Sequence, residues 1–444
     1  PVGWVHDRLG EFVWSKQRQI LESVRDHRRT AVHSCHESGK SWLAARITAW
    51  WLETHPVGEA FVVTSAPSAP QVRAILWREI NRAHGKGKLT GRTNQTEWFM
   101  PTAGGEELVA YGRKPDEFQP GAFQGIHARY VLVIFDEAGS MPDSLWNAAD
   151  SLVANEHSRF LAIGNPDDPQ TEFKAVCDPG SGWNSIGIGY QDTPNFTDEP
   201  VPDDLRDLLI GPTWVEEKRR KWGESNPMFI AKCLGEFPEV TDGGLISAKL
   251  IKAAQDRRLS LGSPIVLGVD VGAGGDRNVI CGRWGSVARI IAADTQPDTM
   301  KTLGNVLGRM REAGAARVNI DMNGVGKGAY DRARELGEKQ VHGINVGEAA
   351  DDSEQFENLR AESFWNLRER FEDGDIDLDP DDDDLAAELV ALKWERSSRG
   401  RIKMESKQQM RREGRSSPDR ADALMLAFAG RKLRSVADFA TMFA

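Results

Sequence analysis

A chain of 444 residues is too long for one ordinary hydrophobic core, so two or three domains are expected. Its hydrophobic and charged fractions, 40% and 28%, are typical of a globular protein, and no apolar run is long enough to cross a bilayer, so we expect no membrane association. The net charge of −11 argues against a protein that coats nucleic acid over its whole surface, although local basic patches can still bind DNA. The four cysteines include no CxxC pair, so they predict neither a zinc site nor a disulfide framework, and a reducing cytoplasm fits.

The first part of the chain alternates short apolar strands with helices. This alternation predicts a mostly parallel sheet covered by helices on both faces, and we assign residues 1–200 to this α/β domain. A hairpin is expected from residues 97–100 and 107–111. The expected strands are 31–33, 59–65, 131–135 and 159–163, and the expected helices are 14–24, 39–54, 69–83 and 142–153.

The segment from Ser34 to Ser41 has the pattern of a phosphate-binding loop. Such a loop needs small residues whose backbone N–H groups face the phosphates, a lysine for the β and γ oxygens, and a hydroxyl for magnesium. Ser34 stands where the first glycine of the usual pattern would be, so the loop is weak evidence by itself. The predicted nucleotide-binding residues of the loop are Ser34, His36, Ser38, Gly39, Lys40 and Ser41.

A continuously apolar strand, 131–135, ends in Asp136 and Glu137. Because ligands bind at the carboxyl edge of a parallel sheet, we expect Asp136 to hold Mg2+ and Glu137 to polarise the attacking water. The next strand ends in Asn165, which either senses the γ-phosphate or is only part of a turn. Together the loop and this strand predict ATP hydrolysis with ATP and Mg2+ as cofactors.

Trp14 and Gln17 precede the phosphate loop by one helix. An aromatic face and an amide suit adenine, because the Gln17 amide can bond two edges of the base. The alternative for both residues is a capped helix at the protein surface.

Residues 201–245 are rich in proline and acids and are expected to form a helical linker. A second α/β domain, 246–432, then has the strand and helix order β-β-β-α-β-α-β, which is the ribonuclease H arrangement, followed by a tail, 433–444. We expect the acidic run 379–384 to be a solvated turn. The expected strands are 265–271, 279–284, 287–293, 317–321 and 341–346, with helices 300–313, 327–336 and 354–371, a hairpin from 389–394 and 401–405, and a closing helix 418–429.

Four carboxylates are placed to converge in this second domain. Asp270 and Asp321 lie on the first and fourth strands, which are neighbours in a ribonuclease H sheet, and Asp419 and Asp422 lie on one face of the closing helix. Convergent carboxylates repel one another unless divalent cations compensate them, so we predict two Mg2+ or Mn2+ ions and cleavage of phosphodiesters.

The hairpin and the residues after it are basic, which suits a phosphate backbone, although a merely solvated hairpin is the alternative. These basic residues are Lys393, Arg396, Arg399, Arg401, Lys403, Lys407, Arg411, Arg412 and Arg415.

An ATPase of the ASCE/RecA-like P-loop type followed by a ribonuclease H-like (RuvC-like) nuclease resembles the large terminase subunit of tailed bacteriophages. The motifs of the resemblance, in chain order, are Trp14 to Gln17, Ser34 to Ser41, Phe135 to Ala138, Gly164 to Pro166, Gly235 to Pro238, Asp270 to Gly272, Asp321 to Gly326 and Ser417 to Ala423.

The resemblance implies a viral DNA-packaging motor that translocates double-stranded DNA into a procapsid and cuts concatemeric DNA. It also implies a small terminase subunit and the portal protein as partners, and a homo-oligomeric ring, a pentamer when docked. The expected location is the host cell cytoplasm and, transiently, the portal vertex, but not the mature virion; in solution we expect a monomer. The alternative is a cellular helicase–nuclease of repair or restriction, which would need a second motor domain.

One position departs from the family. Many members carry an arginine inside the phosphate loop, where this chain has His36. The stabilising cation then comes from His36 itself or from an arginine elsewhere, in the same or a neighbouring subunit. The candidates are Arg73, Arg78, Arg113 and Arg129. Which of Asp419 and Asp422 is the essential nuclease acid is also left open by the sequence.

Overall fold

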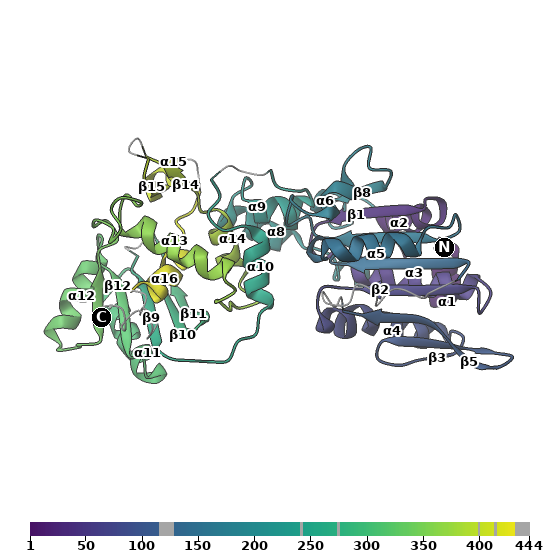
Figure 1. Cartoon of the computed structure of the whole chain (residues 1–444), viewed down its shortest axis with the longest axis horizontal. Helices are drawn as coiled ribbons and strands as arrows, with labels where there is room; N and C mark the ends of the chain where they lie inside the picture. Colours follow the sequence, from purple (N-terminus) through teal and green to yellow (C-terminus); the bar gives the residue numbers. More distant parts are fainter. Residues whose placement is uncertain (115–127, 240–242, 273–275, 398–399, 413–414, 431–444) are drawn as a thin grey trace, which may run out of the picture. The chain divides into compact units, whose positions relative to one another are not determined.

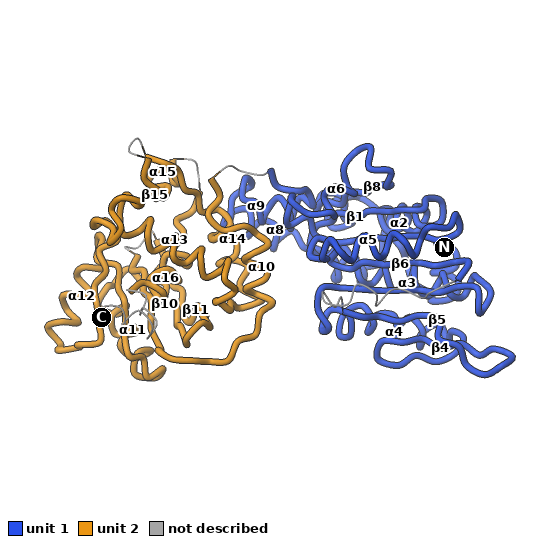
Figure 2. Tube along the Cα trace, viewed as in Figure 1, with its two compact units in different colours: residues 1–240 blue, residues 241–444 orange. Residues whose placement is uncertain are grey.

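The computed structural model describes residues 1–114, 128–239, 243–272, 276–397, 400–412 and 415–430. The chain forms two compact units, Pro1–Val240 and Thr241–Ala444 (Figure 2). The boundary lies within the predicted linker, and the predicted domain limits themselves stay predictions. Arg399 and the predicted tail, 433–444, lie outside the described residues. No helix in the described part of the chain has the length and apolar character that a membrane crossing requires.

The first unit is built on an eight-stranded sheet with the order β3-β4-β5-β2-β6-β7-β1-β8 (Figure 1). The strands from β5 to β8 in this order are parallel, and only β3 and β4 run antiparallel to their neighbours. One strand, β7, separates β1 from β6, which is the strand order of the predicted P-loop ATPase fold. The strands are β1 (Arg29–Ser34), β2 (Ala60–Ser65), β3 (Arg92–Thr93), β4 (Glu97–Thr102), β5 (Gly105–Arg113), β6 (Tyr130–Asp136), β7 (Arg159–Gly164) and β8 (Asn184–Ile188).

Helices surround this sheet. The helix expected over 69–83 is divided into a π-helical segment, η1 (Gln71–Leu76), and α4 (Trp77–Gly87). The others are α1 (Val2–Leu9), α2 (Ser15–Asp26), α3 (Lys40–Thr54), α5 (Asp143–Leu152), α6 (Glu172–Cys177), α7 (Asp203–Arg206), α8 (Pro212–Trp222) and α9 (Pro227–Phe229), with the π-helical η5 (Ile230–Leu234) and the 3-10 turns η3 (Ala138–Ser140) and η4 (Tyr190–Asp192).

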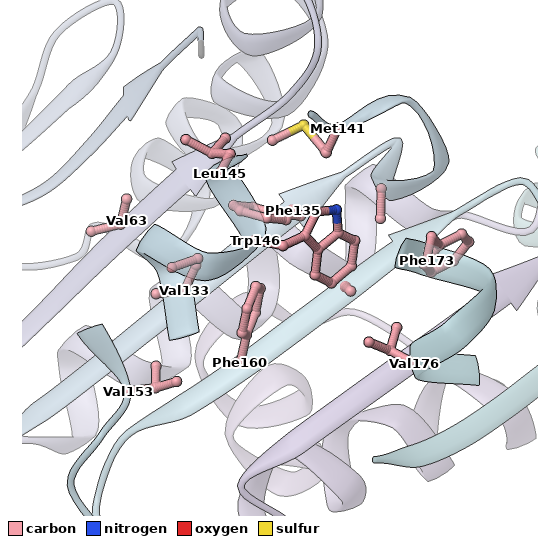
Figure 3. Packing of buried hydrophobic residues seen from close by; sticks show 14 of the residues in the cluster. Val63, Val133, Phe135, Met141, Leu145, Trp146, Val153, Phe160, Phe173 and Val176 are labelled. Carbon is pink, nitrogen blue, oxygen red and sulfur yellow. The ribbon is translucent and has the colours of Figure 1, made fainter. Parts of the chain in front are cut away.

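An aromatic core holds the end of β6 (Figure 3). The Phe135 ring lies 5.2 Å from Trp146 of α5 and 5.0 Å from Phe160 of β7, measured between centroids, and all three side chains are buried. Because successive side chains of a strand point to opposite faces, anchoring Phe135 in this core directs Asp136 away from it. The core therefore positions the first predicted metal ligand.

The second unit contains a five-stranded sheet with the order β11-β10-β9-β12-β13. The strands β9, β10 and β11 are antiparallel, while β12 is parallel to β9 and to β13. The first and fourth strands are neighbours, as the ribonuclease H prediction requires, and the predicted α/β class is confirmed in both units. The strands are β9 (Ile265–Asp270), β10 (Asn278–Trp284), β11 (Val287–Asp294), β12 (Arg317–Asp321) and β13 (Val341–Ile344), with a small hairpin of β14 (Trp394–Arg396) and β15 (Ile402–Met404).

Helices cover both faces of β9. Leu267 and Val269 belong to the core shared with α11 and α12, whereas Gly268 lies directly against α16. The strand period of two therefore places Asp270 on the same face as Gly268, toward α16. The helices of this unit are α10 (Ala248–Asp256), α11 (Thr299–Ala313), α12 (Gly326–Glu335), α13 (Leu359–Glu372), α14 (Asp383–Val390), α15 (Lys407–Arg412) and α16 (Asp419–Phe428).

The acidic run 379–384 is not a solvated turn, so that prediction is wrong. Asp382 is the N-cap of α14, where its carboxylate accepts a hydrogen bond from the Leu385 backbone N–H, and it forms an ion pair with Arg420 at 3.0 Å. The expected strand 389–394 is likewise wrong in its first part, because α14 continues to Val390.

Candidate functional site

The predicted phosphate loop connects β1 to α3 in the first unit. Gly39, with φ of 82°, immediately precedes the helix, and the Lys40 ammonium donates to the Cys35 carbonyl at 2.9 Å. Ser34 and Ser38 are buried, and their hydroxyl groups bond each other across the loop. Ser34, at the place of the usual glycine, therefore stabilises the loop through its side chain.

Ser41 and Asp136 meet at the carboxyl edge of the sheet. The Ser41 hydroxyl donates to Asp136 Oδ2 at 2.7 Å. Burial and, after it, the charge of Glu137 raise the pKa of Asp136 to about 6. A buried carboxylate beside a second acid is stabilised by a cation, and the hydroxyl and carboxylate oxygens here are ligands that Mg2+ prefers.

The turn after β6 is strained and closely packed. Glu137 has a left-handed backbone with φ of 51°, which costs free energy for a non-glycine residue. Gly164 makes the packing possible, because a Cβ there would lie 2.8 Å from the Ala138 nitrogen. The neighbouring Asn165 is buried, and its amide donates to the Ser34 carbonyl at 2.7 Å. Asn165 thus connects the phosphate loop to the turn that carries Glu137.

Gln17 contacts the phosphate loop, but Trp14 does not present a face to a ligand. A Cβ on Gly39 would lie 2.7 Å from Gln17 Nε2, so the Gln17 amide lies directly against the loop. Trp14 is completely buried, with 0% exposure, and the stacking predicted for it is therefore not available in this structure. Whether Gln17 bonds adenine stays a prediction.

His36 connects the loop to the segment after the ATPase sheet. Its backbone N–H donates to the Lys232 carbonyl at 2.8 Å, and its ring centroid lies 6.0 Å from that of Trp214. The packing of His36 against α8 and η5 gives it a structural role beside any catalytic one.

The four candidate arginines lie at different edges of the sheet. Arg113 ends β5 and Arg73 lies in η1, directly after β2, so both belong to the carboxyl edge where the phosphate loop lies. Arg78 follows in α4. Arg129 precedes β6 at the opposite edge and stacks on Tyr130 at 5.2 Å, so it is the least suited of the four.

The predicted carboxylates of the second unit converge around the ammonium group of Lys407. Its Nζ lies 3.2 Å from Asp270 Oδ2, 2.8 Å from Asp422 Oδ2 and 3.8 Å from Asp419 Oδ1. All three carboxylates are buried. Asp321 ends β12 beside β9, and its Oδ1 accepts the Asn323 N–H at 2.9 Å.

The electrostatics of these carboxylates are dominated by burial and by one another. Burial raises the pKa of Asp270 to about 8; Lys407 opposes this shift, and the charges of Asp422 and Asp419 add to it. Burial also raises the pKa of Asp321 and of Asp419. For Asp422 burial is outweighed by Arg360 and Lys407, which lower its pKa, and Arg360 donates to its Oδ1 at 3.1 Å.

The donor atoms fit Mg2+ or Mn2+, since they are hard carboxylate oxygens whose raised pKa values call for a cation. Nevertheless, within the described ranges no three His, Cys, Asp or Glu side chains are arranged as a closed metal site. The Lys407 ammonium accounts for this difference, because it lies between the carboxylates and holds them around its own nitrogen. These residues are suited to divalent ions if Lys407 moves aside.

Two residues at this site were not predicted there. Arg360 precedes Asp422 by 62 residues, and no local pattern marks it. Lys407 was assigned only to the basic surface, because nothing in the local sequence pairs it with Asp270, 137 residues away.

Comparisons with known proteins agree with the motifs. No protein-family model matches the chain. A protein named "Probable terminase, large subunit" of Enterobacteria phage P7 is 26% identical over 286 residues, which are 60% of this chain and 54% of the relative. The chain resembles the large subunit of phage terminases. It spans about half the length of this curated relative.

Solved structures of large terminases are also similar to the chain. The large terminase of a thermophilic bacteriophage is 15% identical, covers 94% of this chain and 98% of its own, and has a TM-score of 0.45. The nuclease domain of the large terminase subunit of bacterial virus Sf6 is 21% identical, covers 43% of this chain and 100% of its own, and has a TM-score of 0.39.

Proposed function

We propose that this chain is an ATPase and metal-dependent DNA endonuclease that acts as the large terminase subunit in packaging phage DNA. The main support is the Ser41–Asp136 hydrogen bond at the carboxyl edge of the first sheet, in the same chain as buried carboxylates on a ribonuclease H sheet. The similarity to the phage P7 relative supports the same conclusion.

For ATP hydrolysis, Ser41 and Asp136 would hold Mg2+, which bridges the β- and γ-phosphates and neutralises developing charge. Lys40 is placed at the start of α3 to contact the phosphates, and Gly39 allows the backbone to approach them. Glu137, which is half-buried beside Asp136, accepts a proton from water or orients it. Asn165 transmits changes at the loop to the Glu137 turn through its bond to Ser34.

For DNA cleavage, Asp270, Asp321, Asp419 and Asp422 would hold two Mg2+ or Mn2+ ions, which activate water and stabilise the leaving oxygen of a phosphodiester. Asp422 is the central acid in this proposal, since its charge acts on both Asp270 and Asp321. Asp419 also accepts the Arg277 backbone N–H at 3.0 Å and is the outer member. Arg360 fixes the orientation of Asp422.

The basic hairpin supports double-stranded DNA as the substrate. Lys403 and Arg411 form ion pairs with Glu395 and Asp276, so these two are partly compensated. Translocation into a procapsid, a pentameric ring on the portal protein, a monomer in solution, the small terminase subunit and a host-cytoplasmic location follow from the resemblance and belong to the same proposal.

The ATPase proposal is tested with the full chain, by phosphate release with and without double-stranded DNA. DNA-stimulated hydrolysis is expected in wild type and should be lost in Lys40→Ala. Activity that survives in Lys40→Ala would refute it. Asp270→Ala is the control, because it lies in the other unit and should keep the ATPase rate.

The nuclease proposal is tested by plasmid cleavage in Mn2+ with each carboxylate changed to Asn in turn. We expect Asp270→Asn, Asp321→Asn and Asp422→Asn to abolish cleavage and Asp419→Asn to reduce it. Lys40→Ala is the matched control and should cleave as wild type does. Cleavage that persists in Asp270→Asn, or needs no divalent ion, would contradict the assignment.

A further inference from the structure

The helix that carries Asp419 and Asp422 begins without a cap of its own. A helix start leaves backbone N–H groups without partners inside the helix, and a Ser, Thr, Asp or Asn at the N-cap usually accepts from them. At α16 the N-cap is Pro418, which offers no side-chain acceptor. The first turn of this helix therefore depends on another part of the chain.

Glu388 of α14 supplies the missing acceptor. Its Oε2 accepts the backbone N–H of Arg420 at 2.7 Å and that of Ala421 at 3.0 Å. These two amides lie between Asp419 and Asp422 in the sequence. One carboxylate oxygen thus holds the backbone that sets the direction of both acidic side chains.

A second contact from α14 holds the same turn. The Arg420 guanidinium bonds both oxygens of Asp382, at 3.1 and 3.0 Å, and lies 3.7 Å from Asp384. The side chain of Arg420 and its backbone N–H are therefore both bound by α14. This arrangement limits rotation of the first turn of α16 about the helix axis and its movement along β9.

We propose that Glu388 is a positioning residue of the carboxylate site: it replaces the N-cap of α16 and thereby holds Asp419 and Asp422 toward Asp270. This inference rests on the proposed nuclease function. The role needs an acceptor oxygen, so glutamine at this position preserves it and alanine removes it. Outer residues that orient metal ligands typically change metal affinity by about 10- to 100-fold when they are lost.

The test compares Glu388→Ala with Glu388→Gln in the full chain. Mn2+ binding is measured by titration calorimetry, and the isotherm of Asp270→Ala is subtracted to remove binding elsewhere. We expect Glu388→Ala to weaken the Asp270-dependent Kd by about tenfold and Glu388→Gln to stay within about twofold of wild type. Amide hydrogen exchange without metal should rise at Arg420 and Ala421 in Glu388→Ala.

Glu362→Ala is the matched control. Glu362 also accepts two backbone N–H groups, those of Asp351 at 2.7 Å and Asp352 at 3.4 Å, but in a different loop. Its loss should leave the Mn2+ Kd unchanged. A general loss of folded protein would reduce the binding stoichiometry of Glu388→Ala and leave the Kd of the folded fraction unchanged, so it would not mimic the expected result.

The outcomes separate the two proposals. A wild-type protein that cleaves DNA through Asp270, together with an unchanged Kd in Glu388→Ala, would overturn the positioning role alone. Wild-type protein that shows neither Asp270-dependent Mn2+ binding nor cleavage would overturn the nuclease assignment and the positioning role with it. Unchanged hydrogen exchange at Arg420 and Ala421 would overturn the positioning role whatever the metal does.

Discussion

The contact between β9 and α16 should not tolerate even one added methyl group. A Cβ on Gly268 would lie 2.2 Å from the Ala423 carbonyl oxygen and 2.2 Å from the Ala427 nitrogen. Both are backbone atoms inside a helix, so neither can rotate away as a flexible side chain would. Gly268→Ala must move α16 away from the strand that carries Asp270, and Asp422 moves with it.

The size of the effect follows from the kind of atoms involved. Overpacking a core typically costs about 1–3 kcal/mol, and contacts with rigid backbone place Gly268→Ala near about 3 kcal/mol. For a unit of about 200 residues, each 1 kcal/mol lowers the melting temperature by about 2–4 °C, so a decrease of about 6–12 °C is expected. Mn2+-dependent cleavage should be lost, while DNA-stimulated ATP hydrolysis in the first unit should persist.

Gly304→Ala is the matched control within the same unit. Gly304 lies in the middle of α11, and a Cβ there would meet nothing within 4 Å. The change removes a helix-interior glycine and should raise stability by about 0.5–1 kcal/mol. The transition that Gly304→Ala shifts upward in thermal unfolding identifies the second unit. If Gly268→Ala lowers that transition by less than about 2 °C and keeps wild-type cleavage, the close packing inferred for β9 and α16 is wrong.

Three further changes test the electrostatics and the loop connection. Asn165→Ala leaves the buried Ser34 carbonyl without its partner, so we expect ATP binding to persist in a fluorescent-nucleotide assay and hydrolysis to fall at least about tenfold; unchanged hydrolysis would contradict the coupling role. Lys407→Ala leaves neighbouring carboxylates unpaired, so its melting temperature in EDTA should be lower than that of wild type, and Mn2+ should raise it by more; equal shifts would refute this. Because burial raises the pKa of Asp270 to about 8, the folded state binds this proton more tightly than the unfolded chain, and metal-free stability should fall as the pH rises from about 4 to 8. Asp270→Asn should flatten that pH dependence of the melting temperature, and an equally steep decrease in the variant would refute the assignment.

Much of the framework was predictable from local patterns. The strand 131–135 is continuously apolar, which left few alternatives to a central parallel strand, and β6 (Tyr130–Asp136) matches it. The order of strands and helices after residue 263 predicted that Asp270 and Asp321 end neighbouring strands, and β9 and β12 do pair. Alternating elements of this kind allow few topologies, so their order carries most of the information.

The features that the sequence did not reveal depend on partners far away along the chain. The acidic run before α14 has the composition of a solvated turn, and only its proximity to Arg420 makes Asp382 a buried ion-pair member. Trp14 has the composition of a ligand-facing aromatic, and only tertiary packing buries it. The predicted helix 354–371 begins later, at Leu359, because the Asn358 side chain caps it by accepting the Ala361 N–H.

The two candidate metal sites differ in how their buried carboxylates are compensated before a metal binds. Asp136 has a neutral donor, Ser41, at 2.7 Å, so a cation that arrives with the nucleotide adds charge where none opposes it. Asp422 is already paired with Arg360 at 3.1 Å and with Lys407 at 2.8 Å. A divalent ion at the second site therefore competes with an ammonium group, and part of its attraction to the carboxylates offsets the loss of that ion pair. It follows that Mn2+ should bind the carboxylate site more weakly than the intact charge count suggests, and that Lys407→Gln should tighten the Asp270-dependent Kd. A Kd that is unchanged or weaker in Lys407→Gln would show instead that Lys407 supports the metal-bound arrangement.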